Sequence, residues 1–111
     1  ASRVRPGFVK VVWTDRAKAR LRSIRDYIAR DSPRVADDVA RRLLERSRQL
    51  EVLARSGRQV PEYQRDDVRE LLERPYRIIY VILAERIDVI SVMHYRQLLP
   101  DDLQDLGDES S

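Results

Sequence analysis

One stretch constrains the fold of this chain more than any other: residues 76–96, with the sequence YRIIYVILAERIDVISVMHYR. Ile, Val, Leu and Tyr dominate both halves of the stretch, and the polar pair Glu85-Arg86 separates them. The enrichment in β-branched and aromatic residues, the length of each half and the polar residues at their ends favour two strands over a buried helix. The stretch therefore predicts a β-hairpin.

The pairing within this hairpin decides which side chains share a face. If Glu85-Arg86 is a two-residue turn, Arg77 lies opposite His94, the only histidine of the chain, and Tyr76 lies opposite Tyr95. Residues two apart along a strand point to the same side of a sheet. The face of Arg77 and His94 would then also carry an apolar belt of Ile79, Val81, Ile90 and Val92. We expect the function to involve this face.

Length and charge indicate a single domain with a modest core. The chain has 111 residues, of which 42% are hydrophobic and 37% charged. All 22 basic residues and 14 of the 19 acidic ones lie in residues 1–100, which therefore carry a charge of +8. A basic body suits nucleic acid or an acidic protein partner. We expect residues 1–100 to form one domain and the acidic residues 101–111 to form a flexible tail.

Several classes of protein and site are disfavoured by the composition. The chain has no cysteine, which argues against disulfides and thiolate metal sites and fits a reducing compartment. The opening ASRVRPGF lacks the apolar core of a signal peptide, and the longest apolar run, residues 78–84, is too short to span a membrane. We expect a soluble, cytoplasmic protein without a metal or another cofactor.

The first half of the chain predicts a strand and two helices. Residues 8–13 (FVKVVW) form the strand, and Thr14 is a good N-cap for the helix that follows. The apolar residues of that helix recur at helical spacing: Ala17, Leu21, Ile24 and Ile28. Ser32-Pro33 then begins a second helix, for which Gly57 is a suitable left-handed cap. The short connection predicts an antiparallel helical hairpin.

The second half completes a two-layer α+β fold in the order β-α-α-β-β-β. Residues 58–67 predict a polar loop, and residues 68–73 predict a third strand that the turn Arg74-Pro75 joins to the hairpin. Each helix has one apolar stripe, so the helical hairpin can cover only one face of the mainly antiparallel sheet. We expect the other face, with Arg77 and His94, to remain open for solvent or a partner.

A set of short segments then points to a family. In chain order they are Tyr27-Ile28-Ala29, Asp31-Ser32-Pro33, Gly57-Arg58, Val60-Pro61-Glu62, Arg69-Glu70-Leu71, Tyr76-Arg77-Ile78-Ile79-Tyr80 and Val92-x-His94-x-Arg96. Together they resemble the RelE/ParE toxin superfamily over roughly residues 8–99. The resemblance is to the ParE, or plasmid-stabilisation, branch in particular.

The resemblance implies the toxin of a type II toxin–antitoxin pair, neutralised by an antitoxin that is encoded beside it. ParE proteins poison DNA gyrase by protein–protein contact, whereas the RelE and YoeB branches share the fold and cut mRNA on the ribosome. Our leading hypothesis is a ParE-like gyrase inhibitor with a ParD-like antitoxin. The alternative is a ribosome-dependent mRNA endoribonuclease, and a weaker third hypothesis is an inactive member kept as a pairing module.

The ribonuclease alternative requires a base, an acid and a cation at one phosphate. By resemblance, Arg77 would contact the phosphate, Glu62 would be the base, and His94 with Tyr95 would lie near the C-terminal acid of YoeB-like enzymes. Each residue also has a structural interpretation. Arg77 would then pair with a neighbouring glutamate, His94 would be a half-buried strand residue, and Glu62 would be a solvated loop residue.

Under the leading hypothesis no residue is catalytic, and the residues expected to bind a partner are Arg69, Arg77, His94 and Arg96. The position of Arg69 depends on the turn at Arg74-Pro75. With two turn residues it lies on the face opposite Arg77, and with one more it would share that face.

Overall fold

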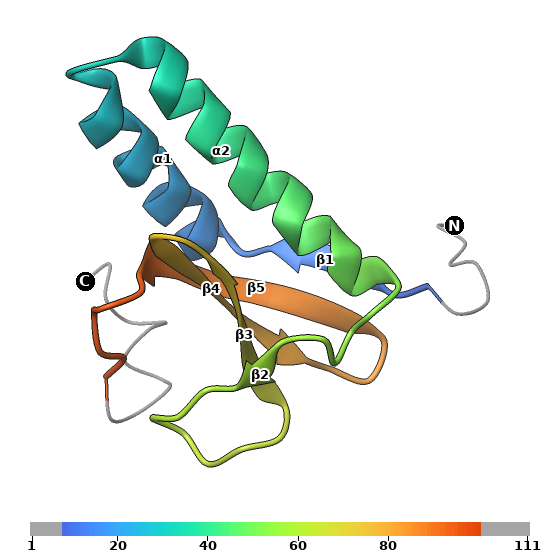
Figure 1. Cartoon of the computed structure of the whole chain (residues 1–111). Coiled ribbons are helices and arrows are strands. Elements are labelled where there is room, and N and C mark those ends of the chain that lie inside the picture. The colour runs from blue at the N-terminus through green and yellow to red at the C-terminus, as the bar shows by residue number, and fades with distance from the viewer. Residues whose placement is uncertain (1–7, 101–111) are drawn as a thin grey trace.

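The computed structural model describes residues 8–100, which form a five-stranded mixed sheet with two helices on one face (Figure 1). The elements are β1 (Lys10–Trp13), α1 (Asp15–Ala29), α2 (Pro33–Arg48), the 3-10 helix η1 (Gln49–Glu51), β2 (Arg58–Gln59), β3 (Val68–Glu73), β4 (Tyr76–Ile82) and β5 (Arg86–His94). The strand order is β1-β5-β4-β3-β2, and only the β1–β5 pair is parallel. The predicted α+β fold with a helical hairpin on a mainly antiparallel sheet is confirmed.

Both helices begin at the predicted caps. The Thr14 side chain accepts a hydrogen bond from the Ala17 amide, and the Ser32 side chain accepts one from the Val35 amide. Each cap satisfies an amide that the first helical turn leaves without a partner. Within residues 8–100, neither helix combines the length and hydropathy needed to cross a membrane.

The end of the second helix differs from the prediction. α2 stops at Arg48 and continues as η1, so Gly57 is not a helix cap. Gly57 is instead required by a close approach, because a Cβ atom there would collide with the Glu70 carbonyl oxygen and lie 2.6 Å from the Tyr80 hydroxyl. The Gly57 amide donates to that hydroxyl at 3.0 Å. The segment before β3 is thus pressed against the sheet rather than coiled into a longer helix.

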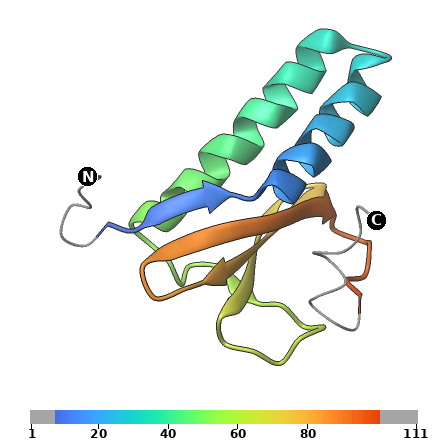
Figure 2. The same ribbon diagram turned by 180° about the vertical axis from the view of Figure 1, so that it is seen from behind.

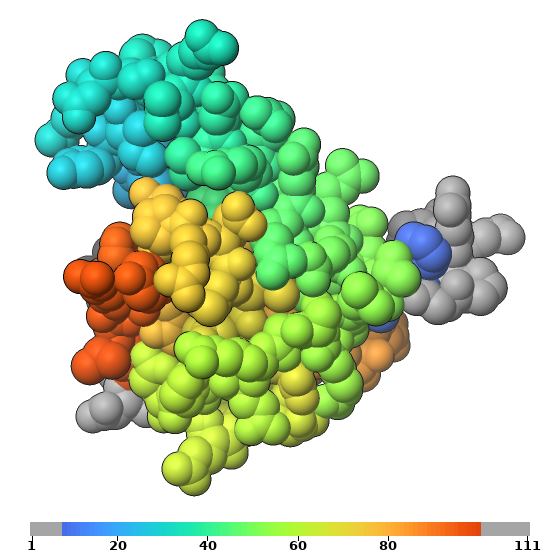
Figure 3. Space-filling model, in the orientation of Figure 1, coloured from blue at the N-terminus to red at the C-terminus, as the bar shows by residue number. Residues whose placement is uncertain are grey.

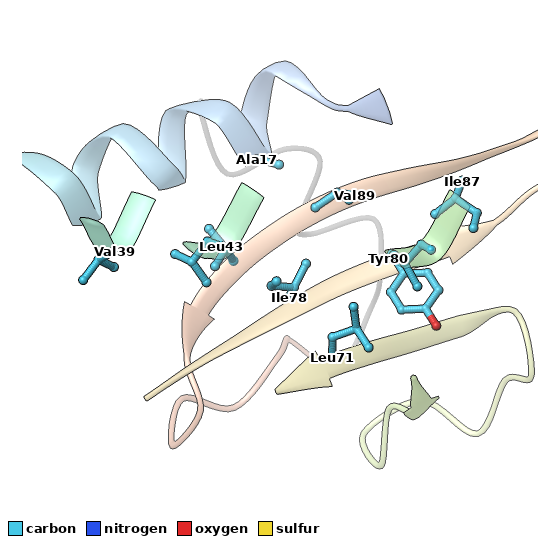
Figure 4. Packing of buried hydrophobic residues seen from close by; sticks show 10 residues of the cluster. Ala17, Val39, Leu43, Leu71, Ile78, Tyr80, Ile87 and Val89 are labelled. Atoms are coloured by element: carbon cyan, nitrogen blue, oxygen red, sulfur yellow. The ribbon is translucent and has the colours of Figure 1, made fainter. Parts of the chain in front are cut away.

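The main core lies between the helices and the sheet. Its buried members are Ala17, Val39, Leu43, Leu50, Leu71, Ile78, Tyr80, Ile87, Val89 and Val92. Figure 4 shows the helix residues of this cluster facing Ile78, Tyr80 and Val89 on the strands. Tyr80 is completely buried and donates to the Ala54 carbonyl at 2.9 Å, so the largest core side chain also fixes the segment after η1.

The face of the sheet away from the helices, here called the far face, is also covered, and the prediction of an open face was wrong. A second buried cluster lies there: Val60, Tyr63, Val68, Ile79, Met93 and Leu99. Figures 1 and 2 show the loop after β2 and the chain after β5 on this side of the sheet. The loop of residues 58–67 is therefore not merely polar, since Val60 and Tyr63 seal the far face.

The hairpin has a different register from the one predicted. Arg77 pairs with Met93, and Tyr76 pairs with His94. The turn consists of residues 84 and 85 instead of 85 and 86, since the Leu83 amide donates a hydrogen bond to the Arg86 carbonyl. That change alone would leave Arg77 and His94 on one face.

A bulge in the same hairpin separates the two residues. Tyr80 pairs with Val89 and Ile79 with Ser91, so Ile90 is an extra residue on β5. Because side chains alternate between the two faces, one extra residue moves every later residue of β5 to the opposite face relative to β4. Arg77 consequently lies on the far face with Met93, whereas His94 lies with Tyr76 on the helix face. The predicted apolar belt is divided in the same way, because Ile79 is in the far-face cluster and Val92 is in the main core.

The remaining strand predictions are mixed. β3 has the predicted bounds, and Glu73 pairs with Tyr76 across the two-residue turn, whose Arg74-Pro75 peptide bond is cis. Arg69 therefore lies on the face opposite Arg77, as this turn predicts. β2 was not predicted, and it forms a two-residue edge strand within the expected loop. The acidic segment 101–111 lies outside the described residues.

Candidate functional site

Arg77 is the centre of a buried ion-pair network on the far face. Its side chain is 5% exposed, and its Nε donates to Glu70 at 2.6 Å. The two terminal nitrogens donate to the two oxygens of Glu62, each at 3.0 Å. Glu70 also accepts from the Nε of Arg58 at 2.5 Å. The network therefore joins β2, β3, β4 and the loop between β2 and β3 by charge-assisted hydrogen bonds.

The network changes the acid–base character of Glu62. Hydrogen bonding from Arg77 lowers the pKa of Glu62 to about 2, and the amide of Leu99 acts in the same direction. Both carboxylate oxygens accept from Arg77, and Oε2 also accepts from the Leu99 amide at 3.0 Å. A carboxylate held in this way is a weak base at neutral pH. Glu62 is thus neither the solvated loop residue nor an available base.

The segment after β5, residues 95–100, forms a strap across the far face. The Tyr95 amide donates to the Pro75 carbonyl at 2.8 Å, which fixes the start of the strap. Further along, the Tyr63 hydroxyl donates to the Pro100 carbonyl at 2.7 Å, and Leu99 is 5% exposed in the far-face cluster. The start and the end of the strap are therefore held against the fold, whereas Leu98 between them is exposed.

A groove lies on the other side of the sheet end, between α1 and the strands. It has a volume of about 290 Å³ and is lined by Arg20, Ser23, Ile24, Tyr27, Tyr76, Val92, Met93, His94 and Gln97. Ile24 and Val92 give it an apolar floor, and no lining residue is acidic. The groove can therefore accept an apolar side chain while its basic rim favours carboxylates nearby.

Aromatic rings and guanidinium groups gather at the same end of the sheet as the groove. His94 stacks on Tyr95 with ring centroids 5.1 Å apart, and Tyr76 meets His94 edge-on at 6.2 Å. Arg74 and Arg96 lie over the Tyr95 ring, at 5.6 and 5.5 Å from its centroid. Figure 3 shows the turn between β3 and β4 beside the chain that follows β5, next to the helical hairpin. We call this surface the arginine–aromatic end.

The arginines of the arginine–aromatic end differ from those of the buried network in their exposure and in their partners. Arg74 and Arg96 are exposed, as is Arg30, which lies 5.5 Å from the Tyr27 ring centroid. Within residues 8–100 none of these three arginines forms an ion pair with a carboxylate. A guanidinium over an aromatic ring is held in place but keeps its donors for a partner.

The predicted site residues therefore separate into two groups. Arg69 and Arg77 are internal: Arg69 donates to Asp66 and to the Gly57 carbonyl, and Arg77 is in the buried network. His94 and Arg96 belong to the arginine–aromatic end. Under the ribonuclease alternative, the structure thus separates His94 from Arg77 and Glu62 by the sheet itself.

A second cavity, of about 320 Å³, lies on the side of Arg77. Its lining residues are Arg58, Pro61, Glu62, Arg77, Tyr95 and Leu98. Tyr95 shares this cavity with Arg77, whereas His94 lines the groove, although the two rings stack at the sheet end. Both guanidinium groups in the cavity are paired with carboxylates. The cavity is consequently a poor site for a phosphate.

Of the residues at this end of the sheet, His94 and Arg96 were predicted to bind a partner, but Tyr27, Arg74 and Tyr76 were not. Tyr27 lies outside the apolar stripe of α1 and is 69% exposed, which is an unusual position for a tyrosine and was the available signal. Arg74 was predicted only as a turn residue, and Tyr76 only as a residue of the hairpin. Among residues 8–100 no cluster of three or more His, Cys, Asp or Glu side chains could hold a metal ion.

Comparisons with known proteins agree on a family. The family model described as "ParE toxin of type II toxin-antitoxin system, parDE" matches residues 11–99. Toxin RelE2 of Caulobacter vibrioides is 34% identical over 89 residues, which are 80% of this chain and 98% of the relative. A solved chain described as "Chromosomal ParDE TA system from P. aeruginosa" superposes with a TM-score of 0.67 at 25% identity, covering 79% of this chain and 97% of the other.

Proposed function

The chain belongs to the ParE toxin family of type II toxin–antitoxin systems, and we propose that it acts in the cytoplasm by binding and inhibiting DNA gyrase. The family membership confirms the resemblance found in the sequence and makes an antitoxin the expected partner. We take that antitoxin to be ParD-like. The gyrase target is what the family leads us to expect, and the surface described above gives antitoxin binding a chemical basis.

The gyrase part of this proposal rests on the family match over residues 11–99. The observation that carries the antitoxin part is the acid-free groove between α1 and the strands. An acidic, amphipathic antitoxin segment would place apolar side chains on Ile24 and Val92. Its carboxylates would meet the guanidinium groups of Arg74 and Arg96. Helix-in-groove binding of this kind uses an apolar floor with opposite charge nearby. The groove supplies the floor, and Arg74 and Arg96 supply positive charge at the same end of the sheet. Among the predicted partner-binding residues, His94 and Arg96 take this role, and Arg69 and Arg77 support the fold.

The geometry favours the ribonuclease alternative less. General acid–base cleavage requires the base, the acid and the cation within hydrogen-bond reach of one phosphate. Glu62 and Arg77 neutralise each other, and His94 lies on the opposite face. We therefore assign no catalytic role to Arg77, Glu62, His94 or Tyr95.

Long-range electrostatics should accelerate capture of the antitoxin. Residues 1–100 carry a charge of +8, which attracts an acidic segment before contact is made. Salt shortens the range of this attraction, because the Debye length falls from about 10 Å at 0.1 M to about 3 Å at 1 M. The association rate should therefore fall as the ionic strength rises, whereas the dissociation rate should change less.

Two assays on the purified toxin test the proposal together. The toxin is titrated into a gyrase supercoiling reaction and, separately, into ribosomes that carry a translated message. We expect supercoiling to fall with toxin concentration and the message to remain uncut. Cleavage of the message without an effect on gyrase would instead establish the ribonuclease alternative. A toxin without effect in either assay would support the hypothesis of an inactive pairing module.

A further inference from the structure

We infer that Arg77 and Glu62 position the groove from the opposite side of the sheet, by holding the strap whose residue Gln97 fixes the backbone of His94. Arg77 and Glu62 do not line the groove, but Gln97 and His94 do. The inference rests on the proposed function in one respect, namely that the groove binds the partner. The positioning itself concerns the free toxin and can be measured without a partner.

A continuous path of hydrogen bonds connects the two faces. Arg77 Nη1 donates to the Gln97 carbonyl at 2.9 Å. The Gln97 amide donates to the His94 carbonyl at 3.0 Å, and Gln97 Oε1 accepts from the His94 amide at 3.1 Å. Both backbone groups of His94 are thus tied to the residue that Arg77 holds. A displacement of Gln97 would move the imidazole and the groove wall together.

Glu62 secures the same strap two residues further on. Its Oε2 accepts from the Leu99 amide at 3.0 Å while it also accepts from Arg77 at 3.0 Å. Loss of the Glu62 charge would weaken both contacts at once, because hydrogen bonds to an ionised carboxylate are the stronger ones. The strap would then be held by the bond from Arg77 to the Gln97 carbonyl, by Tyr95, by Tyr63 and by burial of Leu99.

The hydrogen-bond geometry around residue 77 requires an arginine. Nε faces Glu70, Nη2 faces Glu62, and Nη1 divides its donors between Glu62 and the Gln97 carbonyl. The planar fork of a guanidinium reaches these acceptors in different directions, whereas a lysine ammonium is a single point on a flexible stem. Lysine would keep the positive charge between the two carboxylates but lose the bond to the strap.

Arg58 provides a matched control for Arg77. It forms an ion pair with the same carboxylate, Glu70, on the same face of the sheet. Its side chain is 62% exposed, however, and within residues 8–100 it makes no hydrogen bond to the strap. Replacement of Arg58 therefore perturbs the network without cutting the path to His94.

The positioning is tested on the free toxin by amide NMR and hydrogen exchange. The variants are Glu62→Gln, Arg77→Lys and the control Arg58→Gln. We expect the first two to shift the amide resonances of His94 and Gln97 and to speed exchange at Leu99 by about tenfold or more, as the loss of a charge-assisted hydrogen bond implies. Arg58→Gln should leave these signals near wild type. Unchanged His94 and Gln97 resonances in Glu62→Gln and Arg77→Lys would overturn the inference.

Binding to a poly-L-glutamate peptide tests the consequence for the groove. We expect Glu62→Gln, although its net charge becomes more positive, to bind this acidic probe more weakly than Arg58→Gln does. Equal or tighter binding by Glu62→Gln would contradict the positioning role, since added positive charge alone favours the probe. Failure of the wild-type toxin to bind the probe or inhibit gyrase would instead contradict the proposed function, and the NMR result would still decide the positioning.

Discussion

The two arginine-rich regions of this toxin have opposite electrostatic arrangements. On the far face, Arg77 and Arg58 are matched by Glu62 and Glu70, and the two ion pairs of Arg77 are largely buried. At the arginine–aromatic end, Arg74 and Arg96 lie over an aromatic ring, and no carboxylate of residues 8–100 pairs with either. Arginine content alone therefore does not identify a binding surface in this chain. The presence or absence of an internal carboxylate partner distinguishes the structural arginines from those available to a partner.

The largest expected effect is the loss of the buried cation. Arg77→Ala leaves Glu62 without its cation and leaves the completely buried Glu70 with the exposed Arg58 as its one remaining ion-pair partner within residues 8–100. Breaking a buried pair in this way costs about 3–5 kcal/mol of the free energy of unfolding. Urea denaturation followed by circular dichroism measures it. A loss of less than about 1 kcal/mol would mean that the network does not hold the fold, as for a surface ion pair.

Charge reversal at the other region should affect binding instead. The double variant Arg74→Glu/Arg96→Glu removes both exposed cations that lie over Tyr95. We expect its association rate with an acidic peptide to fall about tenfold at low salt, because steering is lost and repulsion is added. Stopped-flow fluorescence on a labelled poly-L-glutamate peptide measures the rate. The same reversal at Arg34 and Arg42, exposed on α2, provides the control for net charge.

A smaller effect is expected in the pH dependence of stability, which tests the contribution of Glu62 to the buried network. The pKa of Glu62 is lowered to about 2 in the folded toxin from an ordinary value of 4.5. Because the folded value is the lower one, the ionised carboxylate stabilises the fold above about pH 4.5, and this stability is lost as the pH falls from 4.5 towards 2. Glu62→Gln should therefore be less stable than wild type at pH 7. The difference between the two should shrink on acidification, and a constant difference in thermal unfolding from pH 7 to pH 2 would contradict this assignment.

The smallest expected effect on stability is at the groove. Tyr27 is 69% exposed and its ring contacts Arg30 on the same helix. Tyr27→Ala should change the free energy of unfolding by no more than about 0.5 kcal/mol, as for an exposed residue outside the core. The same variant should weaken antitoxin capture, because Tyr27 lines the groove. A variant that unfolds more easily but binds normally would place Tyr27 with the structural residues.

Local features of the fold were predicted better than the face of the sheet on which each strand residue lies. The caps at Thr14 and Ser32 and the bounds of β3 depend on nearby residues, and they were correct. The bulge at Ile90 has no such local signal, because apolar residues point to both sides of β4 and β5 and no alternation fixes the register. The same apolar run is typical of strands covered on both faces, and this was the overlooked indication that the far face is closed.

The candidate site was harder to predict than the fold. Glu62, Arg77 and Gln97 come from three separate segments, and only the folded chain brings them together. The resemblance to ribonuclease toxins identified Arg77 and Glu62 as noteworthy, but it could not indicate that they neutralise each other. The groove was missed because Tyr27, Arg74 and Tyr76 each have an ordinary role when considered alone.

The most direct test of the account is the toxin concentration that halves gyrase supercoiling, measured for Arg74→Glu/Arg96→Glu and for the control Arg34→Glu/Arg42→Glu. The test is made in the presence of a fixed, neutralising amount of ParD-like antitoxin, with both variants first shown to inhibit gyrase alone. We predict that the control remains neutralised and that the Arg74/Arg96 variant escapes neutralisation. Equal neutralisation of the two variants would contradict the assignment of the arginine–aromatic end as the surface that binds the antitoxin.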